Sequence, residues 1–166
     1  MERPNIVQPS VATPAPRRTY WPLDSAVERR DTLLPGPERY RVRVVTTSLN
    51  DSAVVNSIVE DAGPALDVSH NYQSELFVFR GEKPWLHHRL TKTPFVVHPA
   101  TKQLGAEQEW ALSRTEFVAH RQGKFLFYTR LGIPDSDIFV EAEVALSPAH
   151  GLQVISVRQP IEEMEE

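Results

Sequence analysis

Short segments of alternating apolar and polar residues follow one another between residues 38 and 158, and they limit the chain to an all-β fold. In 39–48 valines alternate with arginines, and in 138–146 apolar residues alternate with glutamates. A period of two is expected of strands that bury one face. No helical stretch long enough for a parallel crossover lies between the segments, so we expect antiparallel pairing. About eight segments are spaced as in a β-sandwich or a lipocalin-like meander barrel.

Turn residues set the boundaries of the expected strands. The strands expected are 39–48, 52–59, 72–80, 84–90, 109–113 continuing into 116–121, 124–131, 138–146 and 152–157. Gln122-Gly123 predicts a tight two-residue hairpin, and 91–108 are expected to be irregular, with a short helix or a cover loop. The 72–80 segment is apolar on both faces, which predicts a central strand or one covered on both sides. The side chains expected to face inward from 138–146 are Ile138, Val140, Val144 and Leu146.

The start of the chain differs from the rest in its proline content. Residues 1–38 contain seven of the fourteen prolines, and proline disfavours both helices and strand ladders. We therefore expect 1–38 to be an extended tether, with a proline-rich ligand segment as the less favoured alternative. Within it, Tyr20-Trp21 is expected to pack back onto the domain, and 24–30 to form one or two helical turns. The β domain is expected to occupy 39–160, followed by an acidic tail at 161–166.

The composition excludes several classes of site. Because the chain has no cysteine, it has no disulfide, thiolate metal site or cysteine nucleophile. The net charge is −4 and the last six residues carry four of the acids, so the body is nearly neutral and no nucleic-acid partner is expected. No apolar run approaches the ~20 residues of a transmembrane helix, and no signal peptide is visible at the N-terminus.

No residue pattern identifies a metal, cofactor or catalytic site. His87 and His88 are adjacent on an expected strand, so their side chains point to opposite faces and do not converge on one ion. Asp135 and Asp137 lack the other ligands of a calcium loop, which favours a turn with self-bonding aspartates. No Gly-x-Ser-x-Gly sequence is present. We therefore expect neither a metal nor a cofactor.

One face of the first expected strand is basic. Arg39, Arg41 and Arg43 alternate along 39–48. Such a stripe either grips an anion or forms the hydrated side of an edge strand, whose charges oppose aggregation. We expect the second of these.

The aromatic residues of the strands include candidates for a ligand pocket. Most are expected in the core, and a minority would line a cavity if the interior is hollow. The candidate ligand-binding residues are Trp85, His87, Arg89, Trp110, Phe127, Tyr128 and Arg130. Arg89 or Arg130 would be the polar anchor, and the aromatic side chains would bury a small molecule or a partner's strand or loop.

Three parts of the chain carry a resemblance. They are 40–54, which includes the turn Leu49-Asn-Asp-Ser52, then 76–86, and then the paired strands up to Val157. Together they resemble small bacterial cell-envelope lipoproteins with no assigned activity, in which a polar tether joins a lipidated cysteine to an all-β domain. The resemblance implies a periplasmic or surface location after removal of an N-terminal signal; without such a signal the expected location is cytoplasmic. A lipid anchor is expected outside this chain, because the chain contains no cysteine.

The expected function is that of a non-enzymatic extracytoplasmic binding or accessory module for a small molecule or a protein. Two alternatives stay open. A hydrolase would use dispersed acids and histidines such as Glu141, Glu143 and His120, brought within hydrogen-bonding distance. A structural or protein-interaction domain would show a contiguous exposed apolar patch, with Tyr20-Trp21 as the residues to inspect.

Overall fold

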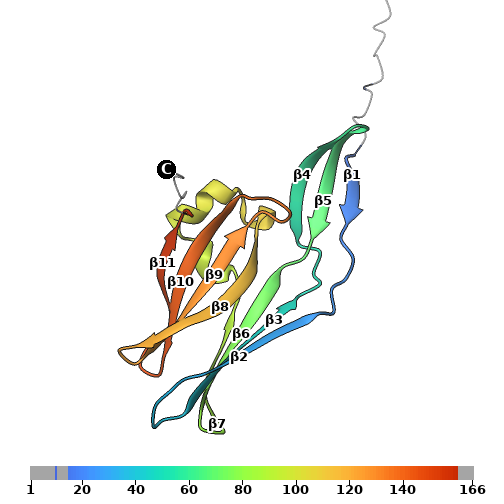
Figure 1. Cartoon of the computed structure of the whole chain (residues 1–166). Coiled ribbons are helices and arrows are strands. Elements are labelled where there is room, and N and C mark those ends of the chain that lie inside the picture. Colours follow the sequence, from blue (N-terminus) through green and yellow to red (C-terminus); the bar gives the residue numbers. More distant parts are fainter. Residues whose placement is uncertain (1–9, 11–14, 161–166) are drawn as a thin grey trace, which may run out of the picture.

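The computed structural model describes residue 10 and residues 15–160, which form a β-sandwich with a smaller third sheet at one end (Figure 1). The predicted tether residues 1–9 and 11–14 and the predicted acidic tail 161–166 lie outside the described residues. The strands are β1 (Arg17–Tyr20), β2 (Val27–Leu33), β3 (Tyr40–Ser48), β4 (Val54–Glu60), β5 (Gly63–Ser69), β6 (Tyr72–Arg80), β7 (Lys83–Leu90), β8 (Ala111–Arg121), β9 (Lys124–Gly132), β10 (Phe139–Ser147) and β11 (Gly151–Arg158). Three 3-10 helices lie between β7 and β8: η1 (Thr93–Phe95), η2 (Pro99–Leu104) and η3 (Glu107–Glu109). No helix in the described residues is long and apolar enough to cross a bilayer.

Two four-stranded antiparallel sheets make the sandwich. One has the strand order β2-β3-β6-β7, and the other has the order β11-β10-β9-β8. The all-β prediction is confirmed, and its sandwich alternative holds, because none of the three sheets closes on itself within the described part of the chain. The 3-10 helices occupy the segment that was expected to be irregular. The tight hairpin at Gln122-Gly123 is also present, with φ of 51° and 73°, as turns between two twisted strands favour.

The core lies between the inward faces of these two sheets. Val42, Val44, Val140 and Val144 are at most 4% exposed, as the alternation of β3 and β10 predicts. β6 is a central strand of its sheet, also as predicted. The largest fully buried side chains are Trp110, Phe95, Phe125, Phe127, Leu76, Leu90, Leu104, Leu112 and Leu131. Burial of each such side chain contributes roughly 1.5–3 kcal/mol, so the sandwich has a self-sufficient core.

A chain of four buried hydroxyl groups crosses the core from one sheet to the other. Thr46 Oγ1 lies 2.8 Å from Ser74 Oγ, and Ser74 donates to Thr115 Oγ1 of the second sheet at 2.8 Å. Thr115 Oγ1 lies 3.0 Å from Thr129 Oγ1, which donates to the carbonyl oxygen of Arg114 at 2.8 Å. Since each hydroxyl has one proton, all four donate in the same direction, from Thr46 toward Arg114. A buried hydroxyl group without a hydrogen bond costs free energy. Because the four groups are bonded only when the two sheets lie in this position, the hydroxyl chain fixes how the sheets align.

The third sheet has the order β1-β5-β4 and projects from one end of the sandwich (Figure 1). β4 and β5 form an antiparallel hairpin, and β1 runs parallel to β5. Two residues separate β5 from β6, so the third sheet grows out of a central strand of the sandwich. Its described side chains take no part in the sandwich core, and its own buried apolar side chains are those of Val54, Ala65 and Val68.

Two segments of the predicted tether are strands instead. Residues 27–33, expected to be partly helical, form β2 and pair antiparallel with β3. All seven residues of β2 are exposed, so no alternation of apolar and polar residues marks this strand in the sequence. β1 pairs with β5. Of the two aromatic residues expected to pack, Trp21 is partly buried and bonded to the domain, whereas Tyr20 is 59% exposed.

The structure corrects three smaller expectations. β5 begins at Gly63-Pro64, a pair typical of turns, in a region where no strand was expected. Ile138 is 50% exposed rather than inward, because β10 begins one residue later at Phe139. Arg41 and Arg43 of the arginine stripe lie on β3, which β2 and β6 flank, so they do not lie on an edge strand, and Arg39 precedes the strand.

Candidate functional site

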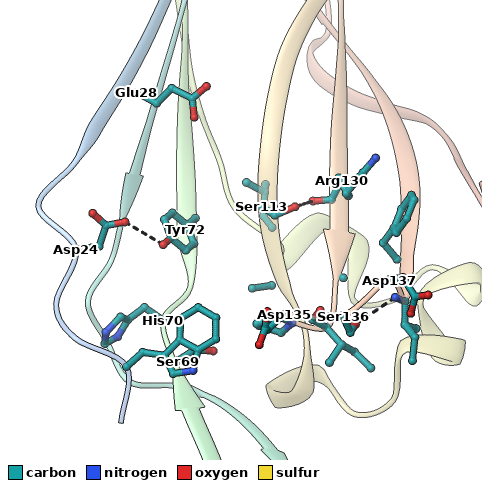
Figure 2. Close-up of a pocket in the computed structure, with 18 of the residues that line it drawn as sticks. Asp24, Glu28, Ser69, His70, Tyr72, Ser113, Arg130, Asp135, Ser136 and Asp137 are labelled. Atoms are coloured by element: carbon teal, nitrogen blue, oxygen red, sulfur yellow. Dashed lines mark hydrogen bonds between the residues drawn. The ribbon is translucent and has the colours of Figure 1, made fainter.

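A cleft of about 960 Å³ opens where the third sheet meets the sandwich (Figure 2). One wall comes from the connection between β1 and β2 and from the junction of β5 and β6. The other wall comes from the first residues of β8 and from the loop between β9 and β10. Small-molecule sites in proteins typically have volumes of about 300–1,000 Å³, so this cleft is large enough for such a ligand.

His70 holds the first wall together. The residue is 4% exposed; its Nδ1 accepts from the backbone N–H of Ser52 at 3.0 Å, and its Nε2 lies 3.1 Å from the carbonyl oxygen of Pro22. Because Nδ1 accepts, Nε2 carries the proton in this arrangement and donates to Pro22. The ring therefore joins the loop between β3 and β4 to the connection between β1 and β2.

Asp24 and Tyr72 carry polar groups of the same wall (Figure 2). The Tyr72 hydroxyl donates to Asp24 Oδ2 at 3.1 Å, and Asp24 Oδ1 accepts from the N–H of Ala26 at 2.9 Å. Asn50 bonds the N–H and the carbonyl of Asp24, at 2.8 and 2.9 Å. Burial and then the hydrogen bond to Asp24 raise the pKa of Tyr72, so this hydroxyl stays a donor at neutral pH. These contacts fix the Asp24 carboxylate at the cleft.

The second wall depends on a close return of the chain at Gly132. A Cβ at this position would lie 2.8 Å from both the carbonyl oxygen of Ile138 and the Cβ of Phe139, so a larger residue would displace the loop. The Arg130 guanidinium lies over the Phe139 ring, 3.9 Å from its centroid. Its Nε is buried and has no hydrogen-bond partner among the described residues.

The charge of the cleft is predominantly negative. Four carboxylates and one guanidinium, that of Arg130, line it. Of these four carboxylates, that of Glu28 alone forms an ion pair among the described residues, and its partner is Arg30. Ser69 adds a hydroxyl on a residue that is 2% exposed, and this hydroxyl has no hydrogen-bond partner in the described part of the chain. The four carboxylates are those of Asp24, Glu28, Asp135 and Asp137.

Apolar side chains form the rest of the lining. Trp21 is held in place because its Nε1 donates to Asp67 at 2.9 Å. No group of three or more potential metal ligands converges in residues 15–160. The apolar lining residues include Trp21, Leu23, Leu112, Ile133, Pro134 and Phe139. The cleft therefore combines apolar surface with several carboxylates, of which that of Asp24 is fixed by hydrogen bonds.

The seven ligand-binding candidates named from the sequence do not come together in the structure. Of the seven, Arg130 alone lines the cleft. Trp110 and Phe127 are at most 1% exposed and belong to the sandwich core. His87 and Arg89 lie beside Glu75, where the His87 ring stacks on a phenylalanine of β6.

The remaining two candidates lie apart from each other and from the cleft: Trp85 packs against the edge of the sandwich core, and Tyr128 lies on an outer face. Trp85 stacks on Tyr40, with ring centroids 5.4 Å apart, and Arg80 lies over the indole. Tyr128 points outward from the second sheet, where it donates to Glu141 at 3.0 Å and burial raises its pKa. A binding role for the candidates outside the cleft stays a prediction.

The residues of the hydrolase alternative are also separated. Glu141 and Glu143 lie on the outward face of β10, opposite Arg130 and Tyr128 of β9. The His120 ring stacks instead on an inward-facing phenylalanine of β9, with ring centroids 4.3 Å apart. The geometry therefore does not assemble an acid–base pair from these three residues.

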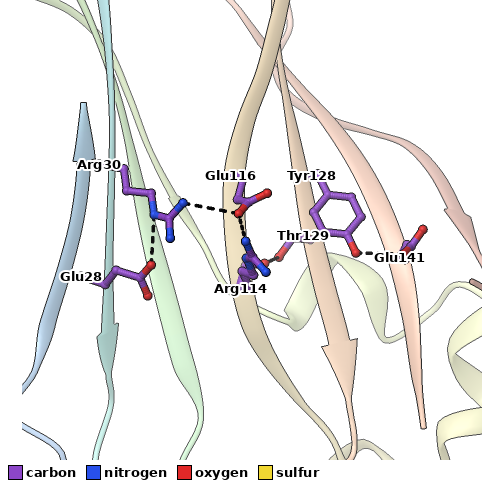
Figure 3. Close-up of polar contacts among 7 residues, drawn as sticks. All are labelled: Glu28, Arg30, Arg114, Glu116, Tyr128, Thr129 and Glu141. Carbon is purple, nitrogen blue, oxygen red and sulfur yellow. Dashed lines mark hydrogen bonds and ion pairs between the residues drawn. The ribbon is translucent and has the colours of Figure 1, made fainter. Parts of the chain in front are cut away.

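Ion pairs connect the edges of the two sandwich sheets near the cleft (Figure 3). Arg30 of β2 lies 3.2 Å from Glu28 and 3.6 Å from Glu116 of β8, and Arg114 donates to the same Glu116 carboxylate. These side chains are largely exposed, so each pair contributes less than about 1 kcal/mol. Because Glu28 also lines the cleft, the network partly neutralises that side of it.

No family model matches the chain, and no curated protein matches it. The function is therefore argued from the cleft itself.

Proposed function

We propose that this protein is a non-enzymatic binding module that takes an organic cation with an apolar body in the cleft between the third sheet and the sandwich. The observation that supports the proposal is an apolar-lined cleft of about 960 Å³ in which three of four carboxylates have no cationic partner among the described residues. The cationic group would lie near Asp24, Asp135 and Asp137. The apolar body would lie against Trp21 and Phe139.

The electrostatics of the cleft favour a cation over an anion. Opposite charges attract more strongly in a partly desolvated cleft than at an open surface. Arg130 would repel the cationic group, so it would orient the ligand with its apolar end toward Phe139. The extracytoplasmic location implied by the resemblance stays a prediction, and binding does not depend on it.

Calorimetric titration with benzylamine, benzyl alcohol and benzoate tests the charge preference directly. We expect benzylamine to bind, and its affinity to fall as salt is added, because salt screens exposed charges. The alcohol and the carboxylate are expected to bind much more weakly. Equal affinity for all three compounds would contradict a site for cations.

A conservative variant of the cleft sharpens the same test. In Asp24→Asn the remaining oxygen can accept from the Ala26 N–H and the new amide group can donate to the Tyr72 hydroxyl, so the charge is lost while the wall should remain folded. We expect it to weaken benzylamine binding about tenfold, since a hydrogen bond to a charged group contributes roughly 1.5–3 kcal/mol. Asp61→Asn, in the exposed turn between β4 and β5, removes the same charge outside the cleft and is the matched control. Equal affinity in Asp24→Asn and Asp61→Asn would contradict a role for the cleft.

A further inference from the structure

A second cavity, of about 480 Å³, lies between the connection of β2 to β3 and the turn between β6 and β7. It is at the opposite end of β6 from the cleft, because Tyr72 begins β6 at the cleft and Arg80 ends it here. Its lining is strongly basic, with four cations and one carboxylate, that of Glu82. The cations of this basic groove are Arg39, Arg41, Arg80 and Lys83.

The cations of the basic groove have no ion-pair partner within the described residues. Elsewhere on the same sheet arginines are paired: Arg43 lies 2.8 Å from Asp31, and Arg89 lies 3.9 Å from Glu75. Unpaired like charges around one hollow repel one another. A bound anion would remove this repulsion, so the groove favours an anionic ligand.

Aromatic rings hold two of these guanidinium groups in place on opposite faces of the sheet, because Arg41 pairs with Phe79 and Arg80 pairs with Tyr40. Arg41 lies 4.5 Å from the ring centroid of Phe79, and its Nε is buried without a hydrogen-bond partner in the described residues. Arg80 lies 4.4 Å from the ring centroid of Trp85 and donates to the Tyr40 hydroxyl at 3.3 Å. A guanidinium fork matches the oxygens of a phosphate group, and one that is already fixed loses less freedom on binding.

We propose that the basic groove binds a phosphate-type oxyanion that carries two or more negative charges, either free in solution or as the headgroup of an anionic lipid. Arg41 supplies the fixed inner donors of the site. Arg39 and Lys83 are exposed and reach the outer oxygens of the ligand. The site is separate from the acidic cleft, and this proposal does not rest on the proposed function.

The experiment uses the full chain and follows the backbone N–H signal of Gly81 and the indole N–H signal of Trp21 by NMR during titration with pyrophosphate at constant ionic strength. Gly81 should shift with saturation, because it lines the basic groove. Trp21 lines the cleft and should not move, so the same spectrum reads the two sites separately. The proposal is overturned if Gly81 shows no saturable shift and the protein also fails to cosediment with anionic vesicles.

Three variants, each losing one positive charge, test whether the groove itself is responsible. We expect Arg41→Gln to weaken pyrophosphate binding about tenfold or more, since a charged hydrogen bond contributes roughly 1.5–3 kcal/mol. Lys83→Gln changes an exposed residue and should weaken binding less, which keeps the test decisive if Arg41→Gln does not fold. Arg121→Gln lies on the exposed hairpin of β8 and β9, outside the groove, and should leave the affinity unchanged. The proposal is overturned if Arg121→Gln weakens binding as much as the other two.

Vesicles distinguish the two sources of the phosphate group. Cosedimentation of the protein with phosphatidylcholine vesicles that contain phosphatidic acid, lost in Arg41→Gln, supports a lipid headgroup. A saturable response to pyrophosphate without cosedimentation supports a soluble ligand. If the protein neither responds to pyrophosphate nor cosediments, the groove is not a phosphate site.

Discussion

The sandwich is held together by apolar side chains, whereas the third sheet is held at its base by hydrogen bonds. Phe125 and Phe127 are fully buried between the sandwich sheets. At the base of the third sheet, Trp21 donates to Asp67, and His70 bonds the backbone of the segments on either side of it. Regions with few buried apolar contacts open locally at lower free energy than the core around them. The cleft therefore has one rigid wall, on the sandwich, and one wall that opens more easily.

A truncation in the sandwich core is the strongest test of this difference. We expect Phe127→Ala to lower the free energy of unfolding by about 3–5 kcal/mol, because it leaves a cavity in a filled core. Ile155→Ala, at a residue that is 48% exposed, is expected to change the free energy by less than about 0.5 kcal/mol. Denaturant unfolding measures both values. Similar values for the two variants would show that the sheets are not packed as described.

The buried hydroxyl chain is the next strongest contribution to the sandwich. Ser74 is its second member, so Ser74→Ala leaves the Thr46 hydroxyl without its acceptor and removes the donor to Thr115, which keeps its bond to Thr129. We expect a loss of about 1–3 kcal/mol in the free energy of unfolding. Ser156→Ala, at an exposed position of β11, makes the same chemical change and should have almost no effect. Equal stability of the two variants would mean that the hydroxyl chain does not align the sheets.

A variant at His70 should loosen the third sheet and leave the sandwich intact. His70→Ala removes the bonds to Ser52 and Pro22, each of which contributes roughly 0.5–1.5 kcal/mol. Amide hydrogen exchange should speed up in β1 and at Ser52 but not in β9 or β10. His150→Ala, at an exposed residue, should change neither set of rates. Faster exchange throughout the sandwich would contradict the separation of the two regions.

The smallest expected effect concerns β2, the exposed edge of the sandwich. Hydrogen bonds from Arg43 and then from Arg29 lower the pKa of Asp31 from 3.8 to about 2. A carboxylate with a depressed folded pKa stabilises the fold above its unfolded pKa, and this stabilisation is lost as the pH falls through about 2. Because Asp31 is exposed, Asp31→Asn should cost less than about 1 kcal/mol at neutral pH. The free energies of unfolding of the unmutated protein and of Asp31→Asn, measured along a pH series, should approach each other in acid. A difference that stays constant with pH would contradict the role of the Asp31 carboxylate.

The regions that the sequence predicts well are those where burial alternates along a strand. Val42 and Val44 on β3, and Val140 and Val144 on β10, are buried at the positions that the period of two indicates. β2 and β5 were missed for physical reasons. Every residue of β2 is exposed, and β5 begins with Gly63-Pro64, so neither strand has a clean alternating pattern.

The cleft itself could not be predicted, because its walls come from segments far apart in the chain. Residues 21–24 were interpreted as an aromatic patch and a helix start, and 132–137 as a turn. The parallel register of β1 with β5 brings the first segment to the cleft, and the close return at Gly132 brings the second. Parallel pairing of a short terminal strand leaves no periodic signal in the sequence. Arg130 was identified as a polar anchor, but its neighbours at the cleft were not.

The measurement that tests the central claim most directly is a titration of the full chain with benzylamine, followed through the indole N–H signals of Trp21 and Trp85. Trp21 lines the acidic cleft, and Trp85 lies under Arg80 at the other end of β6. If the cleft binds organic cations, Trp21 shifts with saturation while Trp85 stays in place, and Asp24→Asn weakens the response. If Trp21 does not move, or if both signals drift together without saturation, the cleft is not a binding site for cations.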